Sequence, residues 1–163
     1  MAGTHDHPRQ APTERLKSVA RDLGLDAVGI ARAQAYPHGP FFRAWLDRGF
    51  HGTMGYLAHN AERRLDPRAV LPDARSVVCA AKVYHRSGTP PPRDGSGRGV
   101  VSPYAWGDDY HDHMGRTLER LAGWVRREHG DGTETRTYVD TGPVLERDVA
   151  ATAGVGWIGK NTM

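Results

Sequence analysis

The 163-residue sequence has little cysteine: Cys79 is its one thiol. A single cysteine excludes an internal disulfide. It also cannot by itself hold an iron–sulfur cluster or a structural zinc ion, since both need several protein ligands. Cys79 lies in the run Ser76-Val-Val-Cys-Ala-Ala81, a pattern typical of a buried strand. We therefore interpret it as a small core residue.

Long hydrophobic runs are missing too. The longest, residues 77–81, is far shorter than the about 20 apolar residues that a membrane-spanning helix needs. Residues 1–8 contain no apolar core of a signal peptide. The sequence therefore predicts a cytoplasmic protein with no membrane association.

A strong charge of one sign is also absent. The net charge of +3 permits nucleic-acid binding without arguing strongly for it, and a solvated surface is the simpler interpretation. The composition, 25% charged and 38% hydrophobic, suits one globular domain that is long enough to bury a core. We find no internal repeats.

Hydrophobic periodicity predicts helices that alternate with strands. This order favours an α/β (α+β) fold with a mixed sheet flanked by helices. Residues 1–11 read as a disordered tail, and residues 12–163 as the domain. Residues 85–99 read as a long loop and residues 100–106 as a short extended segment. The expected helices are residues 13–23, 41–46, 53–59, 109–129 and 143–153, and the expected strands are residues 26–31, 75–84 and 135–139.

A glycine-rich segment follows the last expected helix. Gly154-Val-Gly-Trp-Ile-Gly159 has the spacing G-x-G-x-x-G, and with Lys160 it nearly fits a phosphate-binding loop. Both motifs require a preceding strand, whereas here a helix precedes, and Asn161 replaces the hydroxyl residue of the phosphate loop. We therefore favour a helix C-cap followed by a tight turn over a nucleotide-binding domain. Close approach of the backbone to another ligand remains a third interpretation.

Four polar side chains are candidates for chemistry. Asp140 follows an expected strand, where it could either cap the next helix or act as a general acid if its pocket raised its pKa. His111 and His113 lie two apart on an expected helix, so they point in different directions and are a poor metal-ligand pair. One of them could still point into a pocket. Arg64 could lie on a solvated face or bind a polar group of a ligand.

Several blocks of sequence, taken in order, resemble the N-terminal catalytic domain of the epoxyqueuosine reductases. The most specific are Val139-Asp-Thr-Gly-Pro-Val-Leu-Glu-Arg147 and Ala153-Gly-Val-Gly-Trp-Ile-Gly-Lys-Asn-Thr162. The others are Phe41-Phe-Arg-Ala-Trp-Leu46, Gly49-Phe-His-Gly52, Met54-Gly-Tyr-Leu57, Glu62-Arg-Arg-Leu-Asp-Pro67, Leu71-Pro-Asp-Ala-Arg-Ser-Val-Val78 and Tyr104-Ala-Trp-Gly-Asp-Asp-Tyr-His111.

This resemblance implies a cobalamin-binding domain similar to that of reductive dehalogenases. It implies reduction of epoxyqueuosine to queuosine at the wobble position of tRNA, with loss of water. The partners would be a tRNA anticodon stem-loop and an electron donor, acting on a monomer. Two 4Fe-4S clusters in a ferredoxin-like module would carry the electrons to cobalt.

The resemblance also assigns roles to residues. It places the catalytic acid at Asp140, which would also contact cobalamin together with Arg64 and Ser102. Tyr110 and His111 would line the pocket. Three weaker candidates for cofactor binding are Arg147, Lys160 and Asn161.

Two departures from the family pattern limit these expectations. The cluster cysteines are absent, so this chain binds no 4Fe-4S cluster and we expect no metal ligands in it. Pro103 stands where relatives often have a basic residue. We therefore expect a C-terminally incomplete domain that is inactive alone. The alternative is a non-catalytic corrinoid-binding or interaction module of the same fold.

Overall fold

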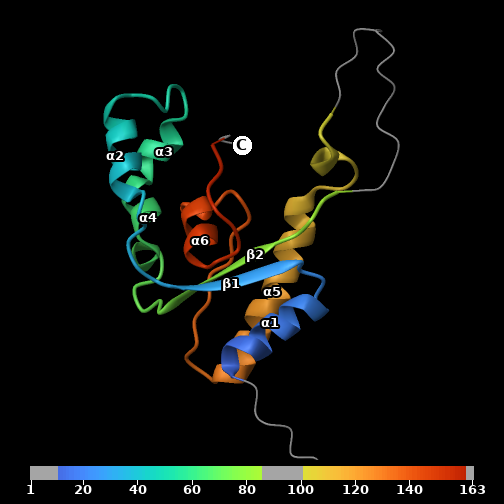
Figure 1. Ribbon diagram of the computed structural model, residues 1–163. Helices are drawn as coiled ribbons and strands as arrows, with labels where there is room; N and C mark the ends of the chain where they lie inside the picture. Colours follow the sequence, from blue (N-terminus) through green and yellow to red (C-terminus); the bar gives the residue numbers. More distant parts are fainter. Residues whose placement is uncertain (1–10, 86–100, 161–163) are drawn as a thin grey trace, which may run out of the picture.

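The structure, a computed structural model, describes residues 11–85 and 101–160. Two short strands lie at the centre, with helices on both sides (Figure 1). Residues 1–10 of the expected tail, residues 86–99 of the expected loop, and Asn161 lie outside the described residues. No helix of the described part is both long and apolar enough to cross a bilayer.

The sheet consists of β1 (Ala27–Arg32) and β2 (Ser76–Ala81), which pair antiparallel. The register joins Ala27 to Ala81 at one end and Arg32 to Ser76 at the other. Because side chains alternate across a strand, Val28 and Ile30 face one side of the sheet. Gly29 and the residue opposite it on β2 face the other side.

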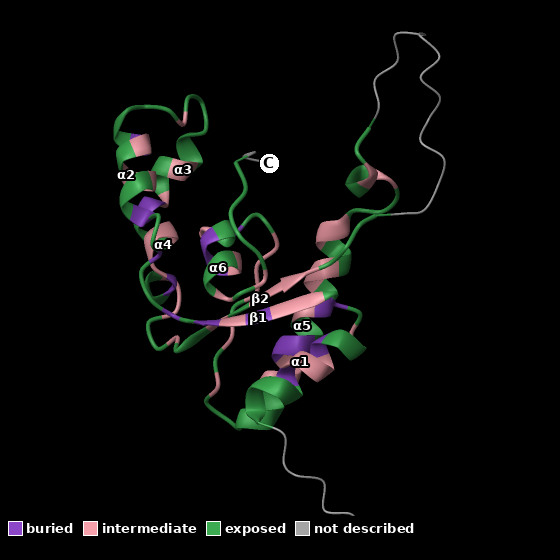
Figure 2. Cartoon of the chain, viewed as in Figure 1, coloured by how far each residue is buried: buried purple, intermediate pink, exposed green. Residues whose placement is uncertain are grey.

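The main core lies on the first of these faces. There α1 (Pro12–Asp22) and α5 (Tyr110–His129) cover the sheet, and the buried side chains lie where they meet it (Figure 2). The buried cluster consists of Leu16, Ala20, Leu25 and Leu121. The half-buried hydrophobic residues packed against it are Val19, Leu23, Val28, Ile30, Ala80, Met114, Trp124 and Val125.

On the opposite face α6 (Glu146–Thr152) lies directly against the strands. Its C-terminal end comes so close to β1 that a Cβ placed on Gly29 would stand 2.2 Å from the carbonyl oxygen of Ala153. Only glycine permits this approach. The close fit fixes the height of α6 above the sheet, and with it the position of the chain that leads into α6.

A group of short helices stands beside α6: α2 (Gly39–Asp47), α3 (Gly55–His59) and α4 (Ala61–Leu65), followed by the 3-10 turn η1 (Pro67–Ala69). The buried carboxylate of Asp148 on α6 accepts a hydrogen bond of 2.9 Å from the backbone N–H of His38 and lies 2.5 Å from the His38 ring. This contact ties α6 to the first turn of α2.

The α+β class and most expected elements are confirmed, with shifted ends. Residues 53–59 form a helix only from Gly55, and α4 was not expected. Residues 101–106 contain the 3-10 turn η2 (Pro103–Ala105) rather than an extended run. The described sheet holds only β1 and β2, which are antiparallel.

Two expectations are wrong. Residues 135–139 form no strand, because no described segment pairs with their backbone. The helix expected from residue 143 begins at Glu146. Val144 instead donates a hydrogen bond of 2.9 Å to the carbonyl of Gly142, and Leu145 has a non-helical ψ of 81°. A tight turn therefore replaces the first turn of that helix.

Candidate functional site

Asp140 sits in an unusual backbone conformation. Among the described residues it is the one non-glycine residue with a positive φ, 54°. Aspartate tolerates the left-handed region better than most residues, but the conformation still has a cost, and such positions cluster at functional sites. The conformation makes the chain turn sharply between the extended residues 135–139 and α6.

The first turn of α5 supplies the nearest partners of Asp140. Asp109 caps this helix by accepting a hydrogen bond of 2.9 Å from the backbone N–H of His111. The cap places two side chains beside Asp140: the phenol of Tyr110 donates a hydrogen bond to Oδ2, and Nε2 of His111 lies 3.7 Å from the same oxygen. The two rings stack with centroids 4.1 Å apart. Residues distant in sequence thus converge on one carboxylate.

These contacts change the acidity of Tyr110 and Asp109. The hydrogen bond to Asp140, followed by partial desolvation and the negative charge of Asp140, raises the pKa of Tyr110 to about 12. The backbone N–H of His111, then its ring, lowers the pKa of Asp109. Tyr110 is therefore a neutral hydrogen-bond donor throughout the physiological range, and Asp109 is ionised.

Arg64 approaches the same loop from α4. Its Nη1 donates a hydrogen bond of 3.1 Å to the carbonyl of Gly142, and its guanidinium lies 6.0 Å from the ring centroid of Tyr56. Its Nε is buried and has no hydrogen-bond partner within the described part of the chain. An unpaired buried donor is costly, so this nitrogen marks a place where a ligand could contribute an acceptor.

Glu146, the first residue of α6, was missed by sequence reasoning. The residue is exposed as a whole, but enough protein surrounds its carboxyl to raise its pKa. After this desolvation the next cause is the neighbouring Asp140 carboxylate, which also interacts with the Glu146 side chain. Arg64 acts in the opposite direction. The signal was available in the sequence, since Glu146 lies within the Val139–Arg147 block.

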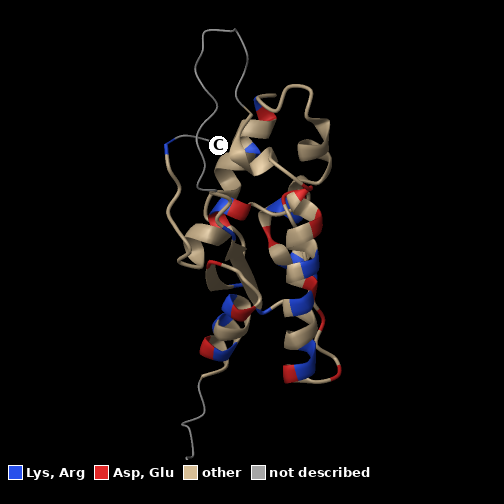
Figure 3. Ribbon diagram, turned by 90° about the vertical axis from the view of Figure 1, so that its right-hand side faces the viewer, with Lys and Arg blue, Asp and Glu red and all other residues tan. Residues whose placement is uncertain are grey.

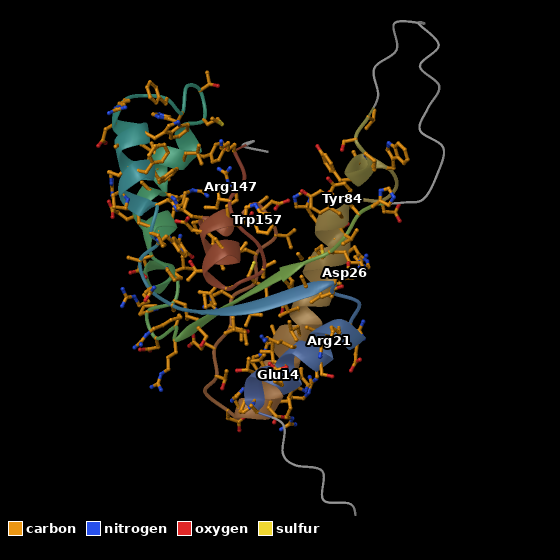
Figure 4. All side chains as sticks on the ribbon, in the orientation of Figure 1. Glu14, Arg21, Asp26, Tyr84, Arg147 and Trp157 are labelled. Carbon is orange, nitrogen blue, oxygen red and sulfur yellow. The ribbon has the colours of Figure 1, made fainter. Side chains whose placement is uncertain are left out.

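An open groove of about 490 Å³ runs beside this cluster. Its lining comes from the start of α5 and from the 137–141 segment: Asp109, His111, Gly115, Thr137, Tyr138, Val139 and Thr141. Two exposed tyrosines continue from Tyr110, because Tyr84 meets Tyr104 and Tyr104 meets Tyr110, each pair edge to face with ring centroids 6.1 Å apart. Tyr84 is labelled beyond the end of β2 in Figure 4. A flat ligand could lie in this groove against aromatic rings.

The structure thus brings four of the predicted site residues together: Arg64, Tyr110, His111 and Asp140. Within the described ranges, no hydrogen bond or ion pair joins Ser102, Arg147 or Lys160 to them. Ser102 is the exposed residue before η2, and Arg147 is exposed on α6, where Figure 4 labels it. Residues 11–85 and 101–160 contain no group of three or more His, Cys, Asp and Glu side chains placed to hold a metal ion.

The glycine-rich segment ends α6, as the C-cap interpretation predicted. Gly154 has a φ of 72° and donates to the carbonyl of Ala151 at 3.1 Å, and Val155 donates to Ala150 at 2.9 Å. Trp157 beyond it is 91% exposed. A helix and not a strand precedes these glycines, so the context that a nucleotide-binding motif requires is absent.

Comparison with known proteins shows similarity to one family. Residues 64–141, which include Arg64, Tyr110, His111 and Asp140, match the profile described as "Epoxyqueuosine reductase QueG, DUF1730". The epoxyqueuosine reductase of Gloeobacter violaceus is 44% identical over 155 residues, which cover 93% of this chain and 46% of that protein.

Solved structures agree. The epoxyqueuosine reductase of Streptococcus thermophilus superimposes with a TM-score of 0.78 at 28% identity, over 91% of this chain and 40% of that one. An epoxyqueuosine reductase crystallised with an epoxyqueuosine-modified tRNA stem loop superimposes with a TM-score of 0.70 at 28% identity. The match covers 89% of this chain and 38% of that one. By these matches the chain is similar to epoxyqueuosine reductases over the part that it spans, which is about half the length of the curated relatives.

Proposed function

We propose that this chain forms the part of an epoxyqueuosine reductase that delivers the proton during reduction of epoxyqueuosine to queuosine in tRNA. The observation that carries the proposal is the convergence of Tyr110 and His111 on Asp140 beside an open groove. This convergence occurs in a chain whose relatives bear the name of that activity.

The residue types suit the reaction. Opening an epoxide leaves a negative charge on oxygen, and a positioned carboxylic acid is a good donor for that oxygen. Tyr110 has a raised pKa and stays protonated, so it orients the Asp140 carboxyl without competing for its proton. His111 lies 3.7 Å from Oδ2 and adds a second polar contact. Asp140 is the group we assign to proton delivery.

Cobalamin fits the groups found here. Arg64 offers a buried Nε that has no partner among the described residues, and the rings of His111 and Tyr138 line an open groove that could take part of a flat macrocycle. Cobalamin would supply the reducing electrons when bound. Ser102, Arg147, Lys160 and Asn161 stay predicted contacts. The single cysteine cannot hold two 4Fe-4S clusters, so we assign these to the other half of the relatives' length.

The substrate we propose is the anticodon stem-loop of tRNA. One relative has been solved with an epoxyqueuosine-modified tRNA stem loop. Positive and negative side chains alternate along α5 (Figure 3), so we expect local contacts at the groove rather than one basic stripe to position the RNA. A cytoplasmic monomer served by a separate electron donor completes the proposal.

The test is conversion of a stem-loop RNA that carries epoxyqueuosine. The protein would be a version extended to the relatives' full length, supplied with cobalamin and a chemical reductant. Nucleosides are then measured by mass spectrometry. The account predicts a product lighter by one oxygen atom. Retained cobalamin with unchanged epoxyqueuosine would contradict it and favour the non-catalytic corrinoid-binding module.

A further inference from the structure

We propose that Tyr84 and Tyr104 form a stacking platform for the unpaired bases beside the wobble nucleoside in the anticodon loop. This inference rests on the proposed function and deepens it, because it assigns a place to the part of the RNA that does not react. Tyr84 lies beyond the end of β2, and Tyr104 lies in the 3-10 turn η2. Two segments that are distant in sequence thus bring their rings together near the start of α5.

Both rings are open to solvent. Tyr84 is 61% exposed and Tyr104 is 52% exposed, and the nearby Val83 and Val101 are exposed as well. A single apolar side chain at the surface is ordinary, whereas a contiguous group of them marks a surface that binds a partner or a ligand. The two tyrosines and their apolar neighbours are such a group.

Hydrogen bonds hold the backbone beside each ring. Oδ2 of Asp26 accepts a hydrogen bond of 2.7 Å from the N–H of Val83, which directly precedes the first tyrosine. On the other segment the indole N–H of Trp106 donates to the carbonyl of Val101 at 2.9 Å, which closes the chain around η2. Because these contacts fix the two segments in advance, a ligand that stacks on the rings has little further ordering to impose.

The two rings lead to the proposed acid. The ring centroids of Tyr84 and Tyr104 lie 6.1 Å apart, and those of Tyr104 and Tyr110 are separated by the same distance. Tyr110 in turn donates its hydrogen bond to Asp140. A nucleoside whose epoxide reaches Asp140 therefore brings the adjoining bases of its strand close to the platform.

The orientation of the rings favours several small flat groups over one large one. The planes of Tyr84 and Tyr104 differ by 76°, and those of Tyr104 and Tyr110 differ by 86°. One rigid macrocycle cannot lie flat on rings that stand nearly at right angles. Unpaired bases can stack on them one by one, because each base turns about its own backbone bonds and every base has a face that stacks on an aromatic ring.

The first test compares binding of an anticodon stem-loop RNA and of a duplex RNA of the same length to this chain, by fluorescence anisotropy. The stem-loop should bind more tightly, because a duplex offers no unstacked bases. Tyr84→Ala and Tyr104→Ala should each weaken stem-loop binding about fivefold or more. Tyr84→Phe and Tyr104→Phe keep the rings and should bind normally. Phe41→Ala is the control, since it removes an exposed ring from α2, on the opposite side of the molecule from Tyr84 (Figure 4).

Salt dependence separates stacking from attraction between charges. A tyrosine ring neutralises no phosphate, and the nearby Lys82 is already paired with Asp26 at 3.4 Å. The two alanine variants should therefore lose affinity by the same factor at every salt concentration, with the slope of log affinity against log salt unchanged. The inference is overturned if the two RNAs bind equally or not at all, if the alanine variants bind normally, or if the slope flattens.

The second test uses turnover by the extended version. Tyr84→Ala should raise KM for the epoxyqueuosine stem-loop about fivefold or more with kcat unchanged, because stacking holds substrate and transition state equally. Its cobalamin content should not change. Loss of cobalamin would assign the ring to the cofactor, and protection of Tyr84 from nitration without RNA would show that protein covers it. Either result would overturn the inference. If the unsubstituted version shows no turnover, the proposed function fails, and the binding test still decides on the platform.

Discussion

The phenol of Tyr110 donates a hydrogen bond to Oδ2 of Asp140, although the two residues are 30 positions apart. Tyr110 opens the longest described helix, and Asp140 has a positive φ in the turn before α6. This bond joins the helix on one face of the sheet to the loop that leads to the helix on the other face. The proposed acid is thus held by the main core as well as by its own loop.

Titration of the tyrosines tests this bond. Both Tyr36 and Tyr110 have a pKa near 12, whereas an ordinary tyrosine has 10. Asp140→Asn should lower the pKa of Tyr110 and leave that of Tyr36, which desolvation raises. Because the folded pKa of Tyr110 is raised, its stabilising effect is full below pH 10 and is lost as pH rises through about 12. Ultraviolet absorbance of tyrosinate measures both groups, and Tyr110→Phe assigns the signal. An unshifted Tyr110 in Asp140→Asn would show that the bond is absent.

The approach of α6 to the sheet predicts a sharp glycine effect. Gly29→Ala should lower the free energy of unfolding by about 1–3 kcal/mol or more, because its Cβ would stand 2.2 Å from the Ala153 carbonyl oxygen. Gly115→Ala is the matched control. No atom lies within 4 Å of a Cβ at that helical position, so it should stabilise by about 0.5–1 kcal/mol. Urea unfolding compares the two. Equal effects would refute the packing described for α6.

Arg64 should stabilise the turn that contains Gly142. Arg64→Ala removes the hydrogen bond to the Gly142 carbonyl and should cost about 1–2 kcal/mol of unfolding free energy. Amide exchange in residues 141–146 should become faster. In the extended version, cobalamin content measured by visible absorbance should fall. The neighbouring Arg63→Ala, an exposed residue, should change none of these. Unchanged exchange and cobalamin content in Arg64→Ala would remove Arg64 from the site.

Asp148 is predicted to anchor α6 to the short helices. Asp148→Ala should cost about 2–3 kcal/mol, since it leaves the His38 backbone N–H without its acceptor. Asp148→Asn, which keeps an acceptor, should cost less. Thermal unfolding measures both, with the exposed Asp47→Ala as control, expected within about 0.5 kcal/mol of the unsubstituted chain. A neutral Asp148→Ala would mean that this contact contributes nothing.

The strongest sequence patterns predicted the core well. The helices α1 and α5 carry a clear apolar stripe, and β1 and β2 are dense in Val and Ala, so local pattern and burial agree. The strand prediction for residues 135–139 was wrong. Their residue types suit a strand, but a strand also needs a neighbouring segment to pair with, and the local sequence pattern does not show whether one exists. The five-residue α4 was missed because it has no side-chain cap to signal its start.

The site, like the fold, was predicted in part from the sequence. Asp140, Tyr110, His111 and Arg64 stood out through the motifs that carry the family resemblance. Glu146 stood in the same motif, but the sequence predicted a helix from residue 143, so the turn at residues 141–145 that leads into Glu146 was not foreseen.

The most direct test of the central claim is turnover of an epoxyqueuosine stem-loop by the extended version carrying Asp140→Asn. The matched control is Asp112→Asn, an exposed carboxylate on the first turn of α5. We predict that Asp140→Asn keeps its cobalamin and loses about 10²-fold or more in kcat, as removal of a general acid does, while Asp112→Asn is unaffected. Near-normal conversion by Asp140→Asn would contradict the assignment of Asp140 as the proton donor.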